Sequence, residues 1–305
     1  MSPLILHHYP LSPYSQKVRS MLGYTGLAWL SAVTKEMPPR PILATLAGGY
    51  RRIPVAQRGA DVFCDSRIIA SEIAAESGRS ELAPENMSED EQRWVEVAEG
   101  KLFFACVMAA GSPELRRKAR QTLGFRDGIR LVTDRWSMGR RAAVSVPGFR
   151  SSGKLVREQL GRVEAALERD FLFGDAPRLG DFATYHGLWF VRDLGEKPYV
   201  ARYPKTVAWM DRIRSFGEGE RREIGAEEAV AIASDAEPRP VADDDTRHAW
   251  VGKQVKVAPS DYGQVPTIGL LVGSTPTRWI VRREVPEVGV LHVHFPKVGF
   301  LLTLA

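Results

Sequence analysis

The sequence has little cysteine and no long apolar run, and each shortage excludes a class of protein. Cys64 and Cys106 are the two cysteines among 305 residues, too few for a disulfide framework. No stretch approaches the ~18 consecutive apolar residues of a membrane-spanning helix. No basic leader with an apolar stretch opens the chain. We therefore expect a cytoplasmic protein that does not bind a membrane.

Three motifs with their own chemistry are also missing or incomplete. The segment 47–50 is too short for a phosphate loop and lacks its lysine. No Cys-x-x-Cys pair occurs, so thiol–disulfide exchange by a protein thiol is not expected. His292 and His294 share one face of an expected strand, and residues 243–245 lie near His248, but neither set completes a metal-ligand count. We expect structural roles for these residues and no metal site.

Length and charge indicate several domains and leave one alternative open. A chain of 33.9 kDa is too long for one average domain, and its 44% hydrophobic content is ample for real cores. Residues 111–170 carry fourteen Lys or Arg and seven Asp or Glu, whereas residues 218–245 carry three and ten. The basic stretch could bind nucleic acid. We favour a solvated helical face, because no aromatic-basic binding motif accompanies the charge.

The first informative signal is the junction between a strand and a helix near residue 12. Residues 4–9 are typical of a strand, and a helix is expected to run to about Tyr24. Ser12 favours a helix start as an N-cap, and Pro13 suits the first helical position. The free N–H groups and the positive dipole end of such a turn favour an anion. A hydroxyl there can donate to a thiolate, although Ser12 can also be a plain cap.

The second signal is a proline at the entrance of an expected strand, in Arg52-Ile53-Pro54-Val55. Proline inside a strand pattern normally weakens the prediction of a strand. A cis bond before Pro54 would resolve the conflict and leave the Ile53 N–H and C=O free to pair with an extended ligand. Because only about 5–6% of X–Pro bonds are cis, the local sequence alone favours trans.

The third signal joins a short strand over residues 61–64 to a helix whose apolar residues are Ile68, Ile69 and Ile73. Asp65 and Ser66 lie at the junction. Ser66 is a credible N-cap, and the helix dipole favours an anion beside it. A plain cap is again the alternative.

In this order and spacing, Ser12 with the Val18-Arg19 pair, Ile53-Pro54 and Asp65-Ser66 resemble the N-terminal domain of the glutathione transferase superfamily. The resemblance implies a thioredoxin-like fold. It also implies that Pro54 is cis, that Ile53 and Pro54 bind the cysteinyl backbone of glutathione, and that Asp65 and Ser66 bind its γ-glutamyl group. Glutathione is thus the expected co-substrate.

The serine-type classes of that superfamily carry a serine in the first turn, and Ser12 falls at that position. A hydrogen bond to a charged group contributes roughly 1.5–3 kcal/mol. Such a bond lowers a thiol pKa of ~8.5 by roughly 1–2 units, enough to make the thiolate the main species. We expect Ser12 to stabilise the glutathione thiolate, with Tyr14, Ser15 and Tyr9 as further candidates.

The middle of the chain resembles the all-helical domain of the same superfamily. Helical periodicity appears over 94–109 and 156–171. Arg178 stands where the family's buried core helix has a Ser or Thr, so its capping box is incomplete, while Asp181 can still serve the helix start. Residues 203–210 resemble the last helix. The resemblance implies an electrophile site lined by candidates in the first long helix: Phe103, Phe104, Cys106 and Met108.

The segment after residue 217 lies outside the ordinary family architecture. We expect an acidic linker with a short helix over 226–233. Five short strand patterns follow, separated by turns with Gly or Pro, over 253–257, 267–272, 278–283, 288–294 and 299–304. They favour a small SH3-like or Greek-key barrel, which would pack on the helical domain or on a partner subunit.

The sequence therefore predicts an α/β thioredoxin-like domain (1–80), an all-α domain (86–217), a linker (218–245) and a small all-β barrel (246–305). The expected function is a glutathione transferase that activates the thiolate for attack on an electrophilic small molecule or a peroxide, as in detoxification. A homodimer is expected from the resemblance. The alternatives are a glutathione-dependent isomerase or ether-cleaving lyase, and a non-catalytic binding or assembly protein.

Overall fold

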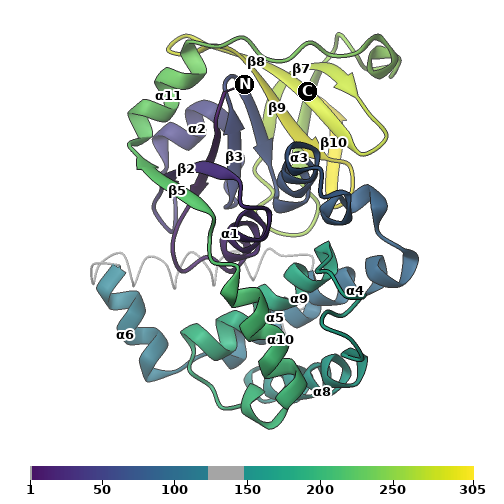
Figure 1. Cartoon of the computed structure of the whole chain (residues 1–305). Coiled ribbons are helices and arrows are strands. Elements are labelled where there is room, and N and C mark those ends of the chain that lie inside the picture. The colour runs from purple at the N-terminus through teal and green to yellow at the C-terminus, as the bar shows by residue number, and fades with distance from the viewer. Residues whose placement is uncertain (1, 123–147) are drawn as a thin grey trace.

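A ten-stranded sheet forms the upper half of the molecule, as drawn in Figure 1, in the computed structural model, which describes residues 2–122 and 148–305. The strands run in the order β10-β6-β7-β8-β9-β4-β3-β1-β2-β5. The helical domain lies below this sheet in Figure 1, and the strands β6–β10 of the C-terminal extension lie at its upper right. The sheet thus combines strands from the first and last parts of the chain.

The N-terminal domain has the expected thioredoxin-like order of elements. Its elements are β1 (Leu4–His8), α1 (Pro13–Thr25), β2 (Ala28–Val33), α2 (Pro41–Ala47), β3 (Val55–Arg58), β4 (Asp61–Cys64) and α3 (Ser66–Ser77). Strand β1 pairs in parallel with β2 and antiparallel with β3, and β3 pairs antiparallel with β4. This arrangement confirms the predicted thioredoxin-like fold of the N-terminal domain.

Local chemistry sets the ends of α1. The Ser12 side chain accepts a hydrogen bond from the Ser15 N–H at 3.2 Å, and Pro13 occupies the first helical position. Gly26 ends the helix with φ at 68°, a left-handed conformation that glycine adopts without steric cost. The turn before α1 is therefore fixed by a side-chain cap and a rigid φ angle.

The helical domain follows two short 3₁₀ turns, η1 (Ser80–Leu82) and η2 (Pro84–Asn86). Its helices are α4 (Glu89–Glu99), α5 (Lys101–Ala109), α6 (Pro113–Thr122), α8 (Phe149–Ala166), α9 (Leu179–Trp189) and α10 (Pro204–Ser215), with the shorter turns η3 (Phe190–Leu194) and η4 (Val200–Arg202). One apolar cluster runs from α1 and α3 into α9 and α10. The two domains therefore share this cluster, while other apolar residues of the N-terminal domain pack with the extension.

A carboxylate from a neighbouring helix supports the start of α9, where the sequence lacks the usual Ser or Thr. Asp181 accepts the Arg178 N–H at 3.0 Å and the Trp209 indole N–H at 2.9 Å. Buried Glu91 of α4 accepts the Gly180 N–H at 3.0 Å. Glu91 thus supplies the acceptor that Arg178 cannot provide.

The C-terminal extension supplies strands to both edges of the N-terminal sheet. Its elements are β5 (Glu220–Ile224), α11 (Ala226–Ser234), η5 (Asp243–Thr246), β6 (Gln254–Pro259), β7 (Thr267–Ser274), β8 (Arg278–Val285), β9 (Gly289–Pro296) and β10 (Phe300–Leu304). Strand β5 pairs in parallel with β2, and β9 pairs in parallel with β4. The five strands β6–β10 confirm the predicted β-rich extension.

Two features of this extension differ from expectation. Residues 220–224 form a strand where the sequence indicates a linker. Their exposed, charged side chains are typical of a linker, but their backbone pairs with β2. The strands β6–β10 also do not stand apart as a separate barrel. They continue the N-terminal sheet, because the outer edge of β4 pairs with β9, from Asp61↔His292 to Phe63↔His294.

Buried polar contacts join the extension to the N-terminal domain. The His294 ring contacts the Asp61 carboxylate through Nε2 at 2.7 Å, and Asp61 also accepts the Arg239 N–H at 3.0 Å. Glu72 of α3 pairs with Arg239 at 3.1 Å and with Arg278 at 2.7 Å. His294 thus links the two domains through its hydrogen-bond contact with Asp61, and burial lowers its pKa although Asp61 opposes the shift.

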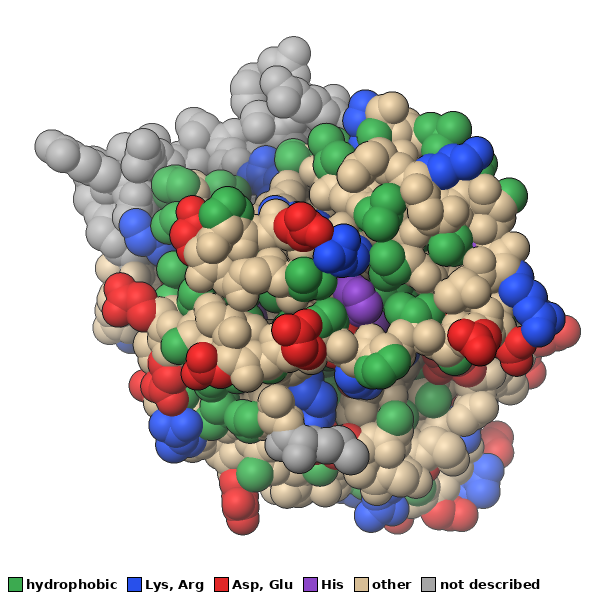
Figure 2. Space-filling model, turned by 90° about the horizontal axis from the view of Figure 1, so that it is seen from above, with side chains coloured by type: hydrophobic (Ala, Val, Ile, Leu, Met, Phe, Trp, Pro, Cys, Tyr) green, Lys and Arg blue, Asp and Glu red, His purple; other side chains and the backbone are tan. Residues whose placement is uncertain are grey.

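The top of the molecule in Figure 1 is a mixed surface. Acidic, basic and hydrophobic side chains are interspersed over the face drawn in Figure 2. No helix in the described part of the chain has the length and apolar character needed to cross a membrane.

Candidate functional site

A cavity of about 140 Å³ lies where the N-terminal domain, the end of α4 and the extension meet. The N-terminal domain and α4 contribute Tyr14, Tyr50, Arg52, Ile53, Pro54, Asp65, Ser66, Arg67 and Glu99. The extension contributes Asp261, Tyr262, Val298, Gly299 and Phe300. Residues from three regions of the sequence thus line one cavity.

The structure brings the four predicted glutathione-binding residues together in this cavity. The Ile53–Pro54 bond is cis, as the resemblance implies and against the local preference for trans. Asp65 caps α3 by accepting the Arg67 N–H at 2.9 Å, and its φ of 85° is unusual for a residue other than glycine. Ser66 is buried beside it. Burial raises the pKa of Asp65, and the cations Arg52 and Arg67 oppose this rise.

The three predicted catalytic residues lie in different surroundings. Ser12 and Ser15 are buried at the start of α1, and neither lines the cavity. Ser12 serves there as the helix cap. Tyr14 does line the cavity, and its hydroxyl donates to the Glu99 carbonyl at 3.1 Å. Burial raises the pKa of Tyr14 well above its usual value, so its phenol keeps its proton at neutral pH.

A buried ion pair beside the cavity is absent from the sequence predictions. The Lys17 ammonium of α1 pairs with the Glu99 carboxylate of α4, and Lys17 is 1% exposed. Its Nζ also lies 3.4 Å from the Ser66 hydroxyl. Burial raises the pKa of Glu99, but the charges of Lys17 and Arg67 outweigh it and lower the pKa overall. One signal was available, since Lys17 shares a helix face with the apolar Met21.

Aromatic rings surround Tyr14 on the side of the helical domain. The Tyr14 ring centre lies 4.7 Å from those of Phe103 and His186. Burial lowers the pKa of His186 to about 4, so this ring is neutral near pH 7. Phe104 meets the Tyr262 ring at 5.8 Å between centres. Phe103 and Phe104 therefore pack against Tyr14 and Tyr262, respectively, two residues that line the cavity.

Two other candidates for the electrophile pocket lie elsewhere. Cys106 is fully buried, and its side chain faces Gly187 of α9, whose added Cβ would lie 3.4 Å from the sulfur. Met108 is 36% exposed. Neither lines the cavity.

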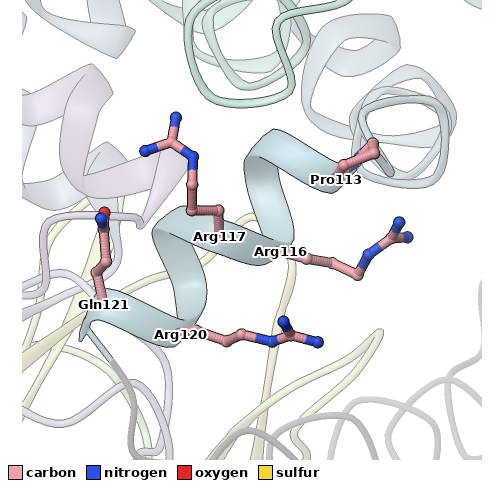
Figure 3. A pocket seen from close by; sticks show the side chains of 5 residues that line it. All are labelled: Pro113, Arg116, Arg117, Arg120 and Gln121. Carbon is pink, nitrogen blue, oxygen red and sulfur yellow. The ribbon is translucent and has the colours of Figure 1, made fainter.

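A second hollow lies along one face of α6, away from these residues. It is lined by Pro113, Arg116, Arg117, Arg120 and Gln121. In Figure 3 the side chains of Arg116 and Arg120 point to the right of the helix, and that of Arg117 points upward. The remainder of the basic stretch includes residues 123–147, which are outside the described residues. The hollow shares no residue with the predicted glutathione site.

Comparison with known proteins agrees with this geometry. The sequence model of the glutathione S-transferase N-terminal domain matches residues 6–81, and that of the C-terminal domain matches residues 151–215. A GST-like protein from Pseudomonas syringae has a similar structure, with 31% identity, a TM-score of 0.76 and full coverage of both chains. The chain belongs to the glutathione S-transferase superfamily. Because both chains are covered in full, this GST-like protein also has a counterpart of the extension.

A second relative of this superfamily member is named for its localisation with FtsZ. FtsZ-localized protein A from Caulobacter vibrioides is 26% identical over 216 residues, which cover 69% of this chain and 86% of that protein. A glutathione transferase family member from Pseudomonas fluorescens, solved with two glutathione bound, is 16% identical with a TM-score of 0.49 and covers 71% of this chain and 93% of its own.

Proposed function

We propose that this chain binds glutathione in the cavity between its N-terminal domain and its extension. The observation that carries the proposal is the convergence of cis Ile53–Pro54, Asp65 and Ser66 on one cavity. The Ile53 backbone beside the cis bond would pair with the cysteinyl unit in the manner of an added strand. Ser66 and Asp65, at the start of α3, would hold the charged γ-glutamyl end.

We also propose that the bound thiol is activated for transfer to an electrophilic small molecule. In this step the thiolate sulfur forms a bond to carbon, and the leaving group departs with the bonding electrons. Tyr14 is the candidate donor to the sulfur, because it lines the cavity with a protonated phenol, whereas Ser12 does not line the cavity. To act, the Tyr14 hydroxyl would exchange its bond to the Glu99 carbonyl for one to sulfur.

Calorimetric titration of glutathione into wild type and Ser66→Ala tests the binding proposal. Loss of a hydrogen bond to a charged group should weaken binding by about 10- to 100-fold. Ser71→Ala is a matched control on the same helix, because Ser71 does not line the cavity and its hydroxyl donates to Glu85 and to the Arg67 carbonyl. Absence of binding to wild type at millimolar glutathione would refute the proposal.

Catalysis is tested separately from binding. Tyr14→Phe should leave glutathione affinity within a few-fold and raise the pKa of the bound thiol by roughly 1–2 units, because a donor to the thiolate is lost. The ultraviolet absorbance of the thiolate, followed against pH, measures this shift. An unchanged thiol pKa would remove Tyr14 from the mechanism and return attention to Ser12.

The second candidate is a non-catalytic assembly role, favoured by the similarity to FtsZ-localized protein A. In that case the transferase fold is a scaffold, and the chain would associate with FtsZ polymers. Co-sedimentation with FtsZ, together with the glutathione titration, separates the two candidates. Binding to FtsZ polymers without glutathione affinity would support the scaffold.

A further inference from the structure

An acidic residue of the extension, Asp261, pairs with Arg52, an arginine that lines the candidate glutathione site. The Arg52 guanidinium pairs with the Asp261 carboxylate, and Arg52 Nε donates to the Tyr262 carbonyl at 3.1 Å. The guanidinium also lies over the Tyr262 ring, 3.9 Å from its centre. Both partners belong to the loop between β6 and β7.

Asp261 is the more accessible member of this ion pair. The Arg52 side chain is 13% exposed, whereas that of Asp261 is 34% exposed. Moving Asp261 into solvent would therefore return a carboxylate to water, while Arg52 would stay in the cavity wall as a cation without its partner. A second carboxylate is the group that best replaces it, because guanidinium binds carboxylates through two parallel hydrogen bonds.

The other charged residues of the site already have partners within the N-terminal and helical domains. Lys17 and Arg67 both approach the Glu99 carboxylate. Asp65 accepts the Arg67 N–H. The pairing of Arg52 with Asp261 is thus the contact at which a ligand can exchange one carboxylate for another without breaking the Lys17–Glu99 pair.

The size of the cavity points to the same loop. A volume of about 140 Å³ is smaller than the ~300–1,000 Å³ of typical ligand pockets, so a tripeptide needs one wall to give way. The part of the wall from the N-terminal domain includes Pro54, beside the start of β3, and Ser66, the first residue of α3. Residues 261–266 of the β6–β7 loop form no strand or helix, and the only other wall segment of this kind in the N-terminal domain, residues 48–54, includes the cis Ile53–Pro54 bond.

We propose that Asp261 occupies the position of a ligand carboxylate on Arg52, so that anionic thiol peptides bind by displacing it. This inference rests on the proposed function, because it states how the same site selects its ligand. Asp261 then determines specificity. A ligand with a carboxylate gains Arg52 in exchange, whereas an uncharged ligand would have to bind beside the intact pair or leave Arg52 unpaired.

Hydrogen exchange in the unliganded protein tests the contact without any ligand. Asp261→Asn should speed exchange of the amides of residues 260–265 severalfold, because the loop loses its ion pair. Asp244→Asn is the control, since it breaks an exposed Asp–Arg pair with Arg247 outside the site. Unchanged exchange in Asp261→Asn would show that the ion pair does not hold the loop and would overturn the inference.

Calorimetry then tests the selection of a carboxylate. Asp261→Asn should bind glutathione about 5- to 30-fold more tightly than wild type or Asp244→Asn, the range expected when one such competing contact is removed. Glutathione diethyl ester, which has no carboxylate, should gain less than about 2-fold, because it has no group to pair with Arg52.

The outcomes separate this inference from the proposed function. Glutathione binding that Asp261→Asn does not tighten would overturn the inference and leave the proposed function standing. An equal gain for glutathione and its diethyl ester would also overturn it, since the loop would then act by bulk alone. Failure of glutathione to bind any of the three proteins would refute the proposed function and the carboxylate exchange together, while the exchange rates still report on the loop.

Discussion

Removal of the Lys17 ammonium should destabilise the protein strongly, because it leaves the Glu99 carboxylate in a buried position with a weaker partner. Lys17 is 1% exposed, and the Glu99 side chain is 18% exposed. Breaking a buried ion pair from one side typically costs about 3–5 kcal/mol. Arg67 lies 3.9 Å from Glu99 and remains as a second cation. We therefore expect Lys17→Met to lower the free energy of unfolding by about 2–4 kcal/mol.

The paired substitution separates charge from packing. Lys17→Met with Glu99→Gln removes both charges and keeps similar volumes, so it should be much closer to wild type than Lys17→Met alone. Urea denaturation at pH 7, followed by circular dichroism, measures all three proteins. A double variant no more stable than Lys17→Met would refute the account, because the loss would then come from packing.

The same pair has a defined pH dependence. In wild type the pKa of Glu99 lies below its usual 4.5, so its contribution to stability is present above that pH and is lost as pH falls through the lowered value. In Lys17→Met burial opposes a weaker attraction, and the pKa of Glu99 rises. The stability difference between wild type and Lys17→Met should therefore grow from pH 4 to pH 7, and a constant difference would contradict this reasoning.

Three further substitutions have defined effects on stability, two of them where the extension meets the N-terminal domain. Gly49→Ala should destabilise the protein by about 1–3 kcal/mol in urea denaturation, because the new Cβ would lie 2.1 Å from the Pro266 carbonyl oxygen. Gly161→Ala, on an open helix face, should instead stabilise by about 0.5–1 kcal/mol. Asp61→Asn should lower Tm at pH 7 by weakening the contacts to His294 and Arg239. Because these groups hold the pKa of Asp61 below 3.8, this difference should shrink as pH falls below about 4; an unchanged Tm would contradict it.

The sequence was sufficient for the fold of the N-terminal and helical domains, and it selected Ile53, Pro54, Asp65 and Ser66, which line one cavity. Strand and helix periodicity, Ser12 as a cap and the order of Ile53-Pro54 and Asp65-Ser66 are local signals, and the structure contains the corresponding elements. The cis bond before Pro54 came from the resemblance, because local energetics favour trans. The roles of Ser12, Tyr14, Ser15, Ile53, Pro54, Asp65 and Ser66 toward glutathione, the electrophile and the homodimer stay predictions.

Long-range pairing is the part that the sequence could not supply. Glu99 becomes part of the site through Lys17, which is 82 residues away along the chain. Asp261 reaches Arg52 across 209 residues. No periodicity or capping rule relates such distant positions, and the charged side chains of residues 220–224 are typical of a linker as much as of an edge strand.

The pairing of the extension with both edges of the N-terminal sheet has a consequence for biosynthesis. The Trp29 indole N–H of β2 donates a hydrogen bond to the carbonyl of Glu218, 189 residues later. Asp61 of β4 contacts His294, 233 residues later. A ribosome delivers the N-terminal strands long before either partner exists. During translation both flanks of the nascent thioredoxin-like unit therefore remain open edges, available to chaperones or to other chains. The unit reaches its final form only when the last strands emerge.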